Sequence, residues 1–134
     1  MIMGTGVDVV DIERFGRIIE RTPRLLDRLF TPEEHELPAH TLAGRFAVRE
    51  AVAKTLHAPP GMIWKHCWVR KNADGAPRLV VTGTVQETAQ WLGINRWHLS
   101  ITHDAGVAVA TVIAEHLSPD ELELARRWEE STWS

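Results

Sequence analysis

The chain has 134 residues, 44% of them hydrophobic and 25% charged, which is enough for one hydrophobic core but not for two ordinary domains. We therefore expect a single domain over residues 1–134. A formal net charge of −3 argues against nucleic-acid binding through bulk charge. One cysteine excludes an internal disulfide, and the sequence shows neither an export signal nor a membrane-spanning apolar run, so we expect a cytoplasmic protein with no membrane partner.

In the first half of the chain the apolar pattern changes from a strand period to a helical one. Alternating apolar residues predict a strand over residues 1–10. The helical period that follows predicts a helix over 11–19 and a second helical piece ending at residue 30. Thr31, followed by proline and then by Glu34, has the form of a helix start. The longest helix is expected to begin near Thr41 and to include residues 45–56.

The second half predicts two hairpins and two further helices. The first hairpin joins residues 64–71 to 78–81, and the second joins 97–103 to 107–114 across turn residues at 104–106. Helices are expected over 84–93 and within a tail at 117–134. These segregated elements predict a mixed α+β fold with antiparallel strands.

Glu50 raises the first functional question, because it falls inside the apolar stripe of the longest helix. A lone ionised carboxylate there is costly, so Glu50 must be paired, protonated or bound to a metal. Asp8 on the first strand is a second carboxylate, and such a pair suits Mg²⁺ that bridges to substrate phosphates. The alternative is a structural ion pair between Glu50 and Lys54 one helical turn later.

His103 and Asp104 end a predicted strand at the tight turn in SITHDAG. Loop-borne functional groups often occupy such places, so a ligand-binding role is one interpretation. The alternative is that His103 is an ordinary surface histidine, and the pattern leaves both interpretations open.

Five arginines gather on the first two helical segments: Arg14, Arg17, Arg21, Arg24 and Arg28. Their helical spacing, in a chain that is acidic overall, favours an acidic partner. The alternative is a solvated face partly neutralised by Glu13, Glu20 and Asp27. Four tryptophans, by contrast, are interpreted as core or interface packing rather than as a base-stacking platform: Trp64, Trp68, Trp91 and Trp97.

Five segments in this order resemble one family. They are GTGVDVVDIERF at 4–15, LFTPEE at 29–34, RFAVREAVAKTL at 45–56, DGAPRL at 74–79 and HLSITHDAGVAVA at 98–110. Together the segments resemble the holo-acyl-carrier-protein synthases, the small class of 4′-phosphopantetheinyl transferases. The resemblance runs from Met1 to about Glu115 and leaves the tail outside.

The resemblance implies a fold, an assembly and a reaction. Members have an antiparallel sheet with packed helices and form homotrimers with active sites at the subunit clefts. They transfer phosphopantetheine from coenzyme A to a serine of apo acyl carrier protein, in support of fatty acid biosynthesis. The five-arginine face is then expected to dock the acidic carrier protein.

The resemblance also assigns roles to individual residues. Asp8 and Glu50 match the Mg²⁺ carboxylates, while Lys54 and His103 match groups that hold the phosphates of coenzyme A. Charge stabilisation by such groups suits phosphoryl transfer. Residues expected near the nucleotide are Arg45 and the turn residues Asp74, Gly75 and Pro77.

Three positions depart from the family pattern and bear on the shape of the nucleotide pocket. Arg49 replaces a common lysine, His57 stands where glycine is frequent, and the link from Glu36 to Thr41 is short.

The base that removes the serine proton has three candidates. We favour a metal-bound water, with Asp104 second and Glu50 as the remaining candidate. Two rival functions also stay open at this stage, a non-catalytic carrier- or nucleotide-binding module and a metal-dependent pyrophosphohydrolase.

Overall fold

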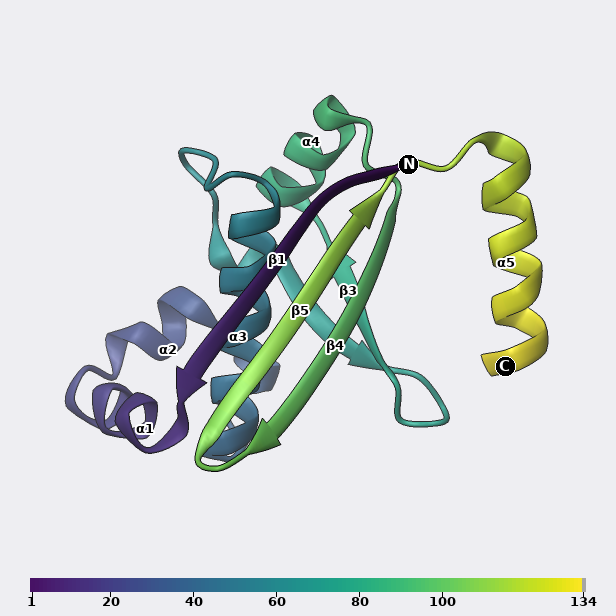
Figure 1. Ribbon diagram of the computed structural model, residues 1–134. Coiled ribbons are helices and arrows are strands. Elements are labelled where there is room, and N and C mark those ends of the chain that lie inside the picture. The colour runs from purple at the N-terminus through teal and green to yellow at the C-terminus, as the bar shows by residue number, and fades with distance from the viewer. Residues whose placement is uncertain (134) are drawn as a thin grey trace.

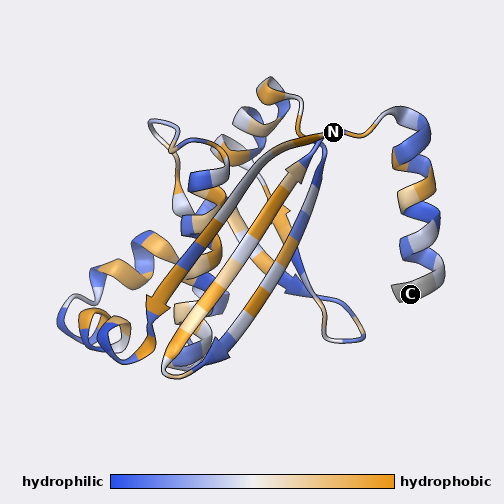
Figure 2. Ribbon diagram, in the orientation of Figure 1, coloured by the Kyte–Doolittle hydropathy of each residue, from blue (hydrophilic) through white to orange (hydrophobic). Residues whose placement is uncertain are grey.

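The computed structural model describes the backbone of residues 1–133 and the side chains of residues 1–131. Its largest sheet has three antiparallel strands in the order β1-β5-β4 (Figure 1). These are β1 (Ile2–Asp11), β4 (Arg96–Asp104) and β5 (Val107–Glu115). Most of the length of the central strand β5 is hydrophobic (Figure 2).

One face of this sheet packs on α3 (Ala39–Thr55), which lies behind it in Figure 1. The alternate residues of β5 on that face are fully or almost fully buried: Ala108, Ala110, Val112 and Ala114. Gly6 allows β1 to come close to the helix, because a Cβ there would lie 2.0 Å from the carbonyl oxygen of Ala51. The close approach places the strand that carries Asp8 directly against the helix that carries Glu50.

Helices α1 (Ile12–Arg21) and α2 (Arg24–Leu29) follow β1 at one end of the sheet. Asp11 caps α1, since its carboxylate accepts a 2.8 Å hydrogen bond from the backbone N–H of Arg14. Thr22 and Pro23 separate the two helices. The helix start predicted at Thr31 is a short 3₁₀ turn, η1 (Pro32–Glu34), whose capping box is complete.

The remaining strands, β2 (Cys67–Lys71) and β3 (Pro77–Val81), form a hairpin that is separate from the large sheet. The strand predicted from residue 64 is wrong over its first three positions, which form a 3₁₀ turn, η2 (Trp64–His66). Helix α4 (Gly83–Leu92) ends at Gly93, whose φ of +79° favours glycine. Helix α5 (Pro119–Trp133) confirms the helix expected in the tail.

The predicted α+β class with antiparallel strands is confirmed, and the core forms one cluster between α3 and the sheets. Trp64 and Trp97 pack against this core, whereas Trp91 is 85% exposed, so of the two interpretations, core or interface packing, only interface packing is left for Trp91 as a prediction. No helix within the described residues is both long and apolar enough to cross a membrane.

Candidate active site

Asp8 and Glu50 line one pocket of about 380 Å³ between β1, α1 and α3. Asp8 pairs with the buried Ala110 across the sheet, so its side chain lies on the face that packs on α3. Lys54 lies one helical turn beyond Glu50, and its ammonium donates 2.9 Å hydrogen bonds to Asp8 Oδ1 and to the carbonyl oxygen of Val7. Three of the predicted site residues are therefore close together.

The ion pair between Glu50 and Lys54 that the sequence left open is not the one formed, because Lys54 reaches across to Asp8 on β1. Burial raises the pKa of Glu50 and the negative charge of Asp8 raises it further, while Lys54 opposes part of the shift. Two carboxylates share one lysine, so their pocket favours an additional cation.

His103 lies on the other flank of α3, in a second pocket of about 300 Å³. Its Nε2 lies 3.1 Å from the carbonyl oxygen of His40. Gly44 makes room for the imidazole, since a Cβ at position 44 would lie 2.9 Å from His103 Nε2. The histidine therefore packs closely on the helix, although part of its ring is open to the pocket.

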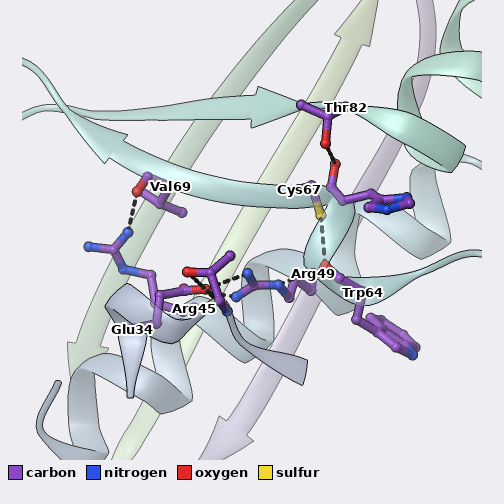
Figure 3. A network of polar contacts seen from close by, with 9 residues as sticks. Glu34, Arg45, Arg49, Trp64, Cys67, Val69 and Thr82 are labelled. Atoms are coloured by element: carbon purple, nitrogen blue, oxygen red, sulfur yellow. Dashed lines mark hydrogen bonds and ion pairs between the residues drawn. The ribbon is translucent and has the colours of Figure 1, made fainter. Parts of the chain in front are cut away.

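Arg45, Gly75 and Pro77 line the same pocket as His103, in agreement with their predicted grouping near a nucleotide. Arg45 donates a 2.6 Å hydrogen bond to the carbonyl oxygen of Val69, which joins α3 to the hairpin (Figure 3). Asp74 has a different place, because its carboxylate accepts a hydrogen bond from the Ala76 N–H and so shapes the turn.

These two pockets lie on opposite flanks of α3. Lys54 bonds Asp8 on β1 and His103 lies on β4, and these two strands are on opposite sides of the central strand β5. A single chain therefore does not bring Lys54 and His103 onto one phosphate group.

Asp104 lies apart from both pockets. It alternates with His103 along β4, so its side chain is on the sheet face that points away from α3. Its carboxylate accepts a hydrogen bond from the N–H of Ala105 in the turn.

The five predicted docking arginines are all exposed, on α1 and α2. Arg14 also lines the pocket of Asp8 and Glu50, so the arginine face begins at the edge of that pocket. Arg17 forms a 3.0 Å ion pair with Glu13, which matches part of the alternative interpretation as a neutralised face.

Sequence reasoning missed two basic residues in the pocket of His103 and one buried ion pair elsewhere on α3. His40 and Lys71 line the pocket of His103, and they add basic donors that no motif distinguishes. Arg49 forms a buried ion pair with Glu34 through two hydrogen bonds of 3.0 and 2.6 Å (Figure 3). The only sequence signal for that pair was an arginine among apolar helix residues.

The fit of Mg²⁺ can be tested on the carboxylates themselves. Within the described part of the chain, no group of three or more His, Cys, Asp and Glu side chains is placed to hold a metal. Mg²⁺ usually takes one or two carboxylates and completes its shell with waters and substrate phosphates. Asp8 and Glu50 fit that donor set, because burial and then the negative charge of Asp8 raise the pKa of Glu50, and a bound cation would offset both effects.

Comparison with known proteins places this arrangement in a family. Residues 4–112 match the model of the 4′-phosphopantetheinyl transferase superfamily. The holo-[acyl-carrier-protein] synthase of Kocuria rhizophila is 60% identical over 115 residues, which cover 86% of this chain and 94% of that protein. The synthase of Micrococcus luteus is 54% identical, with 90% and 98% covered.

A solved structure agrees in fold. The Helicobacter pylori holo-[acyl-carrier-protein] synthase in complex with coenzyme A superposes with a TM-score of 0.73 and is 28% identical. The match covers 83% of this chain and 99% of that chain.

Proposed function

The chain belongs to the 4′-phosphopantetheinyl transferase superfamily, and from this premise we propose that it transfers phosphopantetheine from coenzyme A to a serine of apo acyl carrier protein. The observation that carries the proposal is the pair Asp8 and Glu50 in one pocket, with Lys54 bonded to Asp8. This is a site for a cation and a pyrophosphate.

In the proposed reaction the serine oxygen attacks the pantetheine-bearing phosphorus of the coenzyme A pyrophosphate. The bond from this phosphorus to the bridging oxygen breaks, and adenosine 3′,5′-bisphosphate leaves with the electron pair. Asp8 and Glu50 would hold Mg²⁺, which neutralises the pyrophosphate when bound. Lys54 and His103 would stabilise negative charge on the phosphates, and Arg45 with the Gly75–Pro77 turn would bind the nucleotide.

The serine proton must pass to a base in the same pocket. We assign this role to a water beside the Glu50 carboxylate rather than to Asp104, whose side chain faces away and bonds the turn.

The complete site would need a second copy of the chain, because Lys54 and His103 lie on opposite flanks of α3. A symmetric homotrimer would place the Asp8 pocket of one copy against the His103 pocket of the next. The sheet face that points away from α3 supports such an assembly, because it exposes Val7, Val9 and Ile113, with Val9 59% accessible.

The exposed arginines of α1 and α2 would bind the carrier protein. Arg14 borders the Asp8 pocket, so an acidic protein docked there would present its serine to the reacting phosphorus. A pyrophosphohydrolase of small molecules would not require such a surface.

The deciding assay incubates the protein with coenzyme A, Mg²⁺ and an apo carrier protein. Mass spectrometry should show phosphopantetheine added to the carrier serine and an equal amount of adenosine 3′,5′-bisphosphate. Coenzyme A cleavage without carrier modification would favour a pyrophosphohydrolase, and binding without turnover would favour a binding module.

Subunit complementation tests the shared site. Glu50→Gln and His103→Ala each disable one flank, so mixing the two variants after unfolding should regenerate some sites with both flanks intact. Activity of the mixture well above that of either parent is the expected result. Activity no greater than the average of the parents would place the whole site within one chain.

A further inference from the structure

Helix α5 lies outside the residues that match the family model, and the rest of the chain holds it at both ends. At its base, the side-chain amide of Asn95 exchanges hydrogen bonds of 2.9 and 2.8 Å with the backbone of Leu117. The helix then stands beside the sheet, apart from the other helices (Figure 1). Near its other end Glu129 reaches back to the strands.

Glu129 bridges two strands that belong to different sheets. Its Oε1 lies 3.0 Å from Arg78 on β3 and 2.7 Å from Arg96 at the start of β4. All three side chains are partly buried, with exposed fractions between 17 and 31%. A single carboxylate oxygen therefore forms ion pairs with two arginines.

A third arginine completes a pocket of about 450 Å³, here called the arginine pocket and defined by Arg70, Arg78 and Arg96. Arg70 is directly opposite Arg78 in the hairpin. No ion pair of Arg70 is found among the described side chains. The pocket thus gathers three cationic side chains around Glu129, while the second carboxylate in its lining, Glu130, pairs with Arg126.

The chemistry of the arginine pocket is that of an anion site. Two guanidinium groups that contact the same oxygen lie close enough to repel each other when no anion separates them. Guanidinium donors match carboxylate and phosphate oxygens in geometry as well as in charge. Glu129 acts here as a ligand that the chain itself supplies.

The bridge also holds the hairpin that walls the nucleotide pocket. Strands β2 and β3 form their own two-stranded sheet with no ladder to β4, so side-chain contacts hold the hairpin in place, among them the buried Cys67 and Val69 and the bridge at Glu129. Its inner face supplies Val69, Lys71 and Pro77 to the pocket of His103. Pro77 directly precedes Arg78, so the ion pair between Arg78 and Glu129 restrains the chain one residue away from the pocket wall.

Helix α5 is stiff enough to place Glu129. Ser118 and Glu121 exchange hydrogen bonds that cap its first turn. Along its outer face, Glu123 pairs with Arg126 and Arg127, and Arg126 also pairs with Glu130. The eleven residues from Pro119 to Glu129, at about 1.5 Å each, therefore form a rigid arm.

We propose that the arginine pocket is a carboxylate-binding site filled by the chain's own Glu129, and that filling it holds the β2–β3 hairpin in place as the wall of the nucleotide pocket. Glu129 is thus a positioning residue. The consequence for coenzyme A rests on the proposed function, whereas the consequence for the hairpin does not.

The test compares Glu129→Ala in the full chain with Glu123→Ala, which removes ion pairs within α5 but leaves the bridge. Amide hydrogen exchange over residues 67–81 should speed up in Glu129→Ala and stay unchanged in Glu123→Ala. Added acetate should restore protection in Glu129→Ala by filling the pocket, and chloride at equal ionic strength should not. Arg96→Gln should loosen the hairpin equally, and acetate should not rescue it.

Activity provides the second measurement. The KM for coenzyme A should rise roughly two- to fivefold in Glu129→Ala, as expected for a partly exposed ion-pair network, with kcat little changed and with recovery in acetate. Unchanged hydrogen exchange in Glu129→Ala, or loosening that acetate cannot reverse, overturns the proposal. Loosening that acetate reverses in a protein without transfer activity would sustain it and reject the proposed function instead.

Discussion

Two glutamates contact α3 or lie on it, and their surroundings are opposite. Glu34 is buried beside Arg49, which is 0% exposed. The guanidinium group of Arg49 donates two hydrogen bonds to the Glu34 carboxylate and lies over the ring of Phe30. Burial raises the pKa of Glu34. The hydrogen bonds and the positive charge of Arg49, together with hydrogen bonds from Thr31, outweigh burial and bring this pKa below its ordinary value. Burial and Asp8 together leave the pKa of Glu50 raised.

The difference separates a structural carboxylate from a functional one. Glu34 has its charge fully matched and has no need of a further ligand. Glu50 faces a pocket with a second carboxylate, and Lys54 compensates only part of the negative charge. A carboxylate held in an unfavourable charge state is a candidate for binding or catalysis, whereas a satisfied one stabilises the fold.

Removing the matched partner of Glu34 should give the largest effect. Arg49→Ala leaves a buried carboxylate unpaired, so we expect a loss of about 3–5 kcal/mol in the free energy of unfolding. Urea denaturation followed by tryptophan fluorescence measures this loss. Glu50→Gln serves as the control, and its urea midpoint of unfolding should equal or exceed that of the wild type. Equal stability of Arg49→Ala and the wild type would contradict a structural role for the buried pair.

Glu50→Gln should instead affect the reaction. The amide keeps the shape of the side chain and removes the charge that would hold Mg²⁺, so transfer should fall by roughly 100-fold or more. Initial rates across a Mg²⁺ titration measure the effect. Glu87→Gln, an exposed position on α4, provides a matched control that should keep the full rate. A normal rate and normal Mg²⁺ dependence in Glu50→Gln would remove Glu50 from the metal site.

The two glutamates should also have opposite effects on stability as the pH changes. The lowered pKa of Glu34 means that its contribution is present above the unfolded value of 4.5 and is lost as the pH falls through the folded pKa. The raised pKa of Glu50 means that its contribution is present below 4.5 and is lost as the pH rises through its folded pKa.

Thermal unfolding without metal at pH 8 can therefore compare the two amide variants. Glu50→Gln should melt about 2 °C above the wild type, and Glu34→Gln should melt below it. Both differences should shrink towards pH 3.5. Adding Mg²⁺ should stabilise the wild type and leave Glu50→Gln unaffected. A Glu50→Gln protein that melts below the wild type at pH 8 without metal would mean that its carboxylate is already satisfied.

The smallest effect should come from the arginine face beside the Glu50 pocket. Reversing Arg21 and Arg28 to glutamate, two exposed positions that do not line the Glu50 pocket, should raise the KM for carrier protein roughly fivefold, weaken the dependence of transfer on salt, and leave coenzyme A binding nearly unchanged. Steady-state kinetics at low and physiological salt measure these changes. Arg127→Glu on α5 is the matched control. An equal loss for both substrates would return the arginines to the neutralised-face interpretation.

Local patterns in the sequence determined most of the elements. The capping residue Asp11, the box at Thr31 and the left-handed Gly93 each act within a few residues of their position, and periodicity assigned the strands of the large sheet. The 3₁₀ turn at Trp64–His66 was not predicted from the sequence, because its hydrogen bonds depend on the packing of α3 and the hairpin rather than on residue type.

The tertiary structure alone decided how the site residues group. Lys54 could bond Glu50 one turn away or Asp8 on a strand 46 positions earlier, and only the close approach of β1 at Gly6 favours Asp8. Glu34 and Arg49 were both visible as charges, but their pairing requires η1 to pack on α3. Likewise, the division of Lys54 and His103 between two flanks of one helix follows from where each strand packs. Such choices depend on contacts between distant segments, which residue type and spacing do not encode.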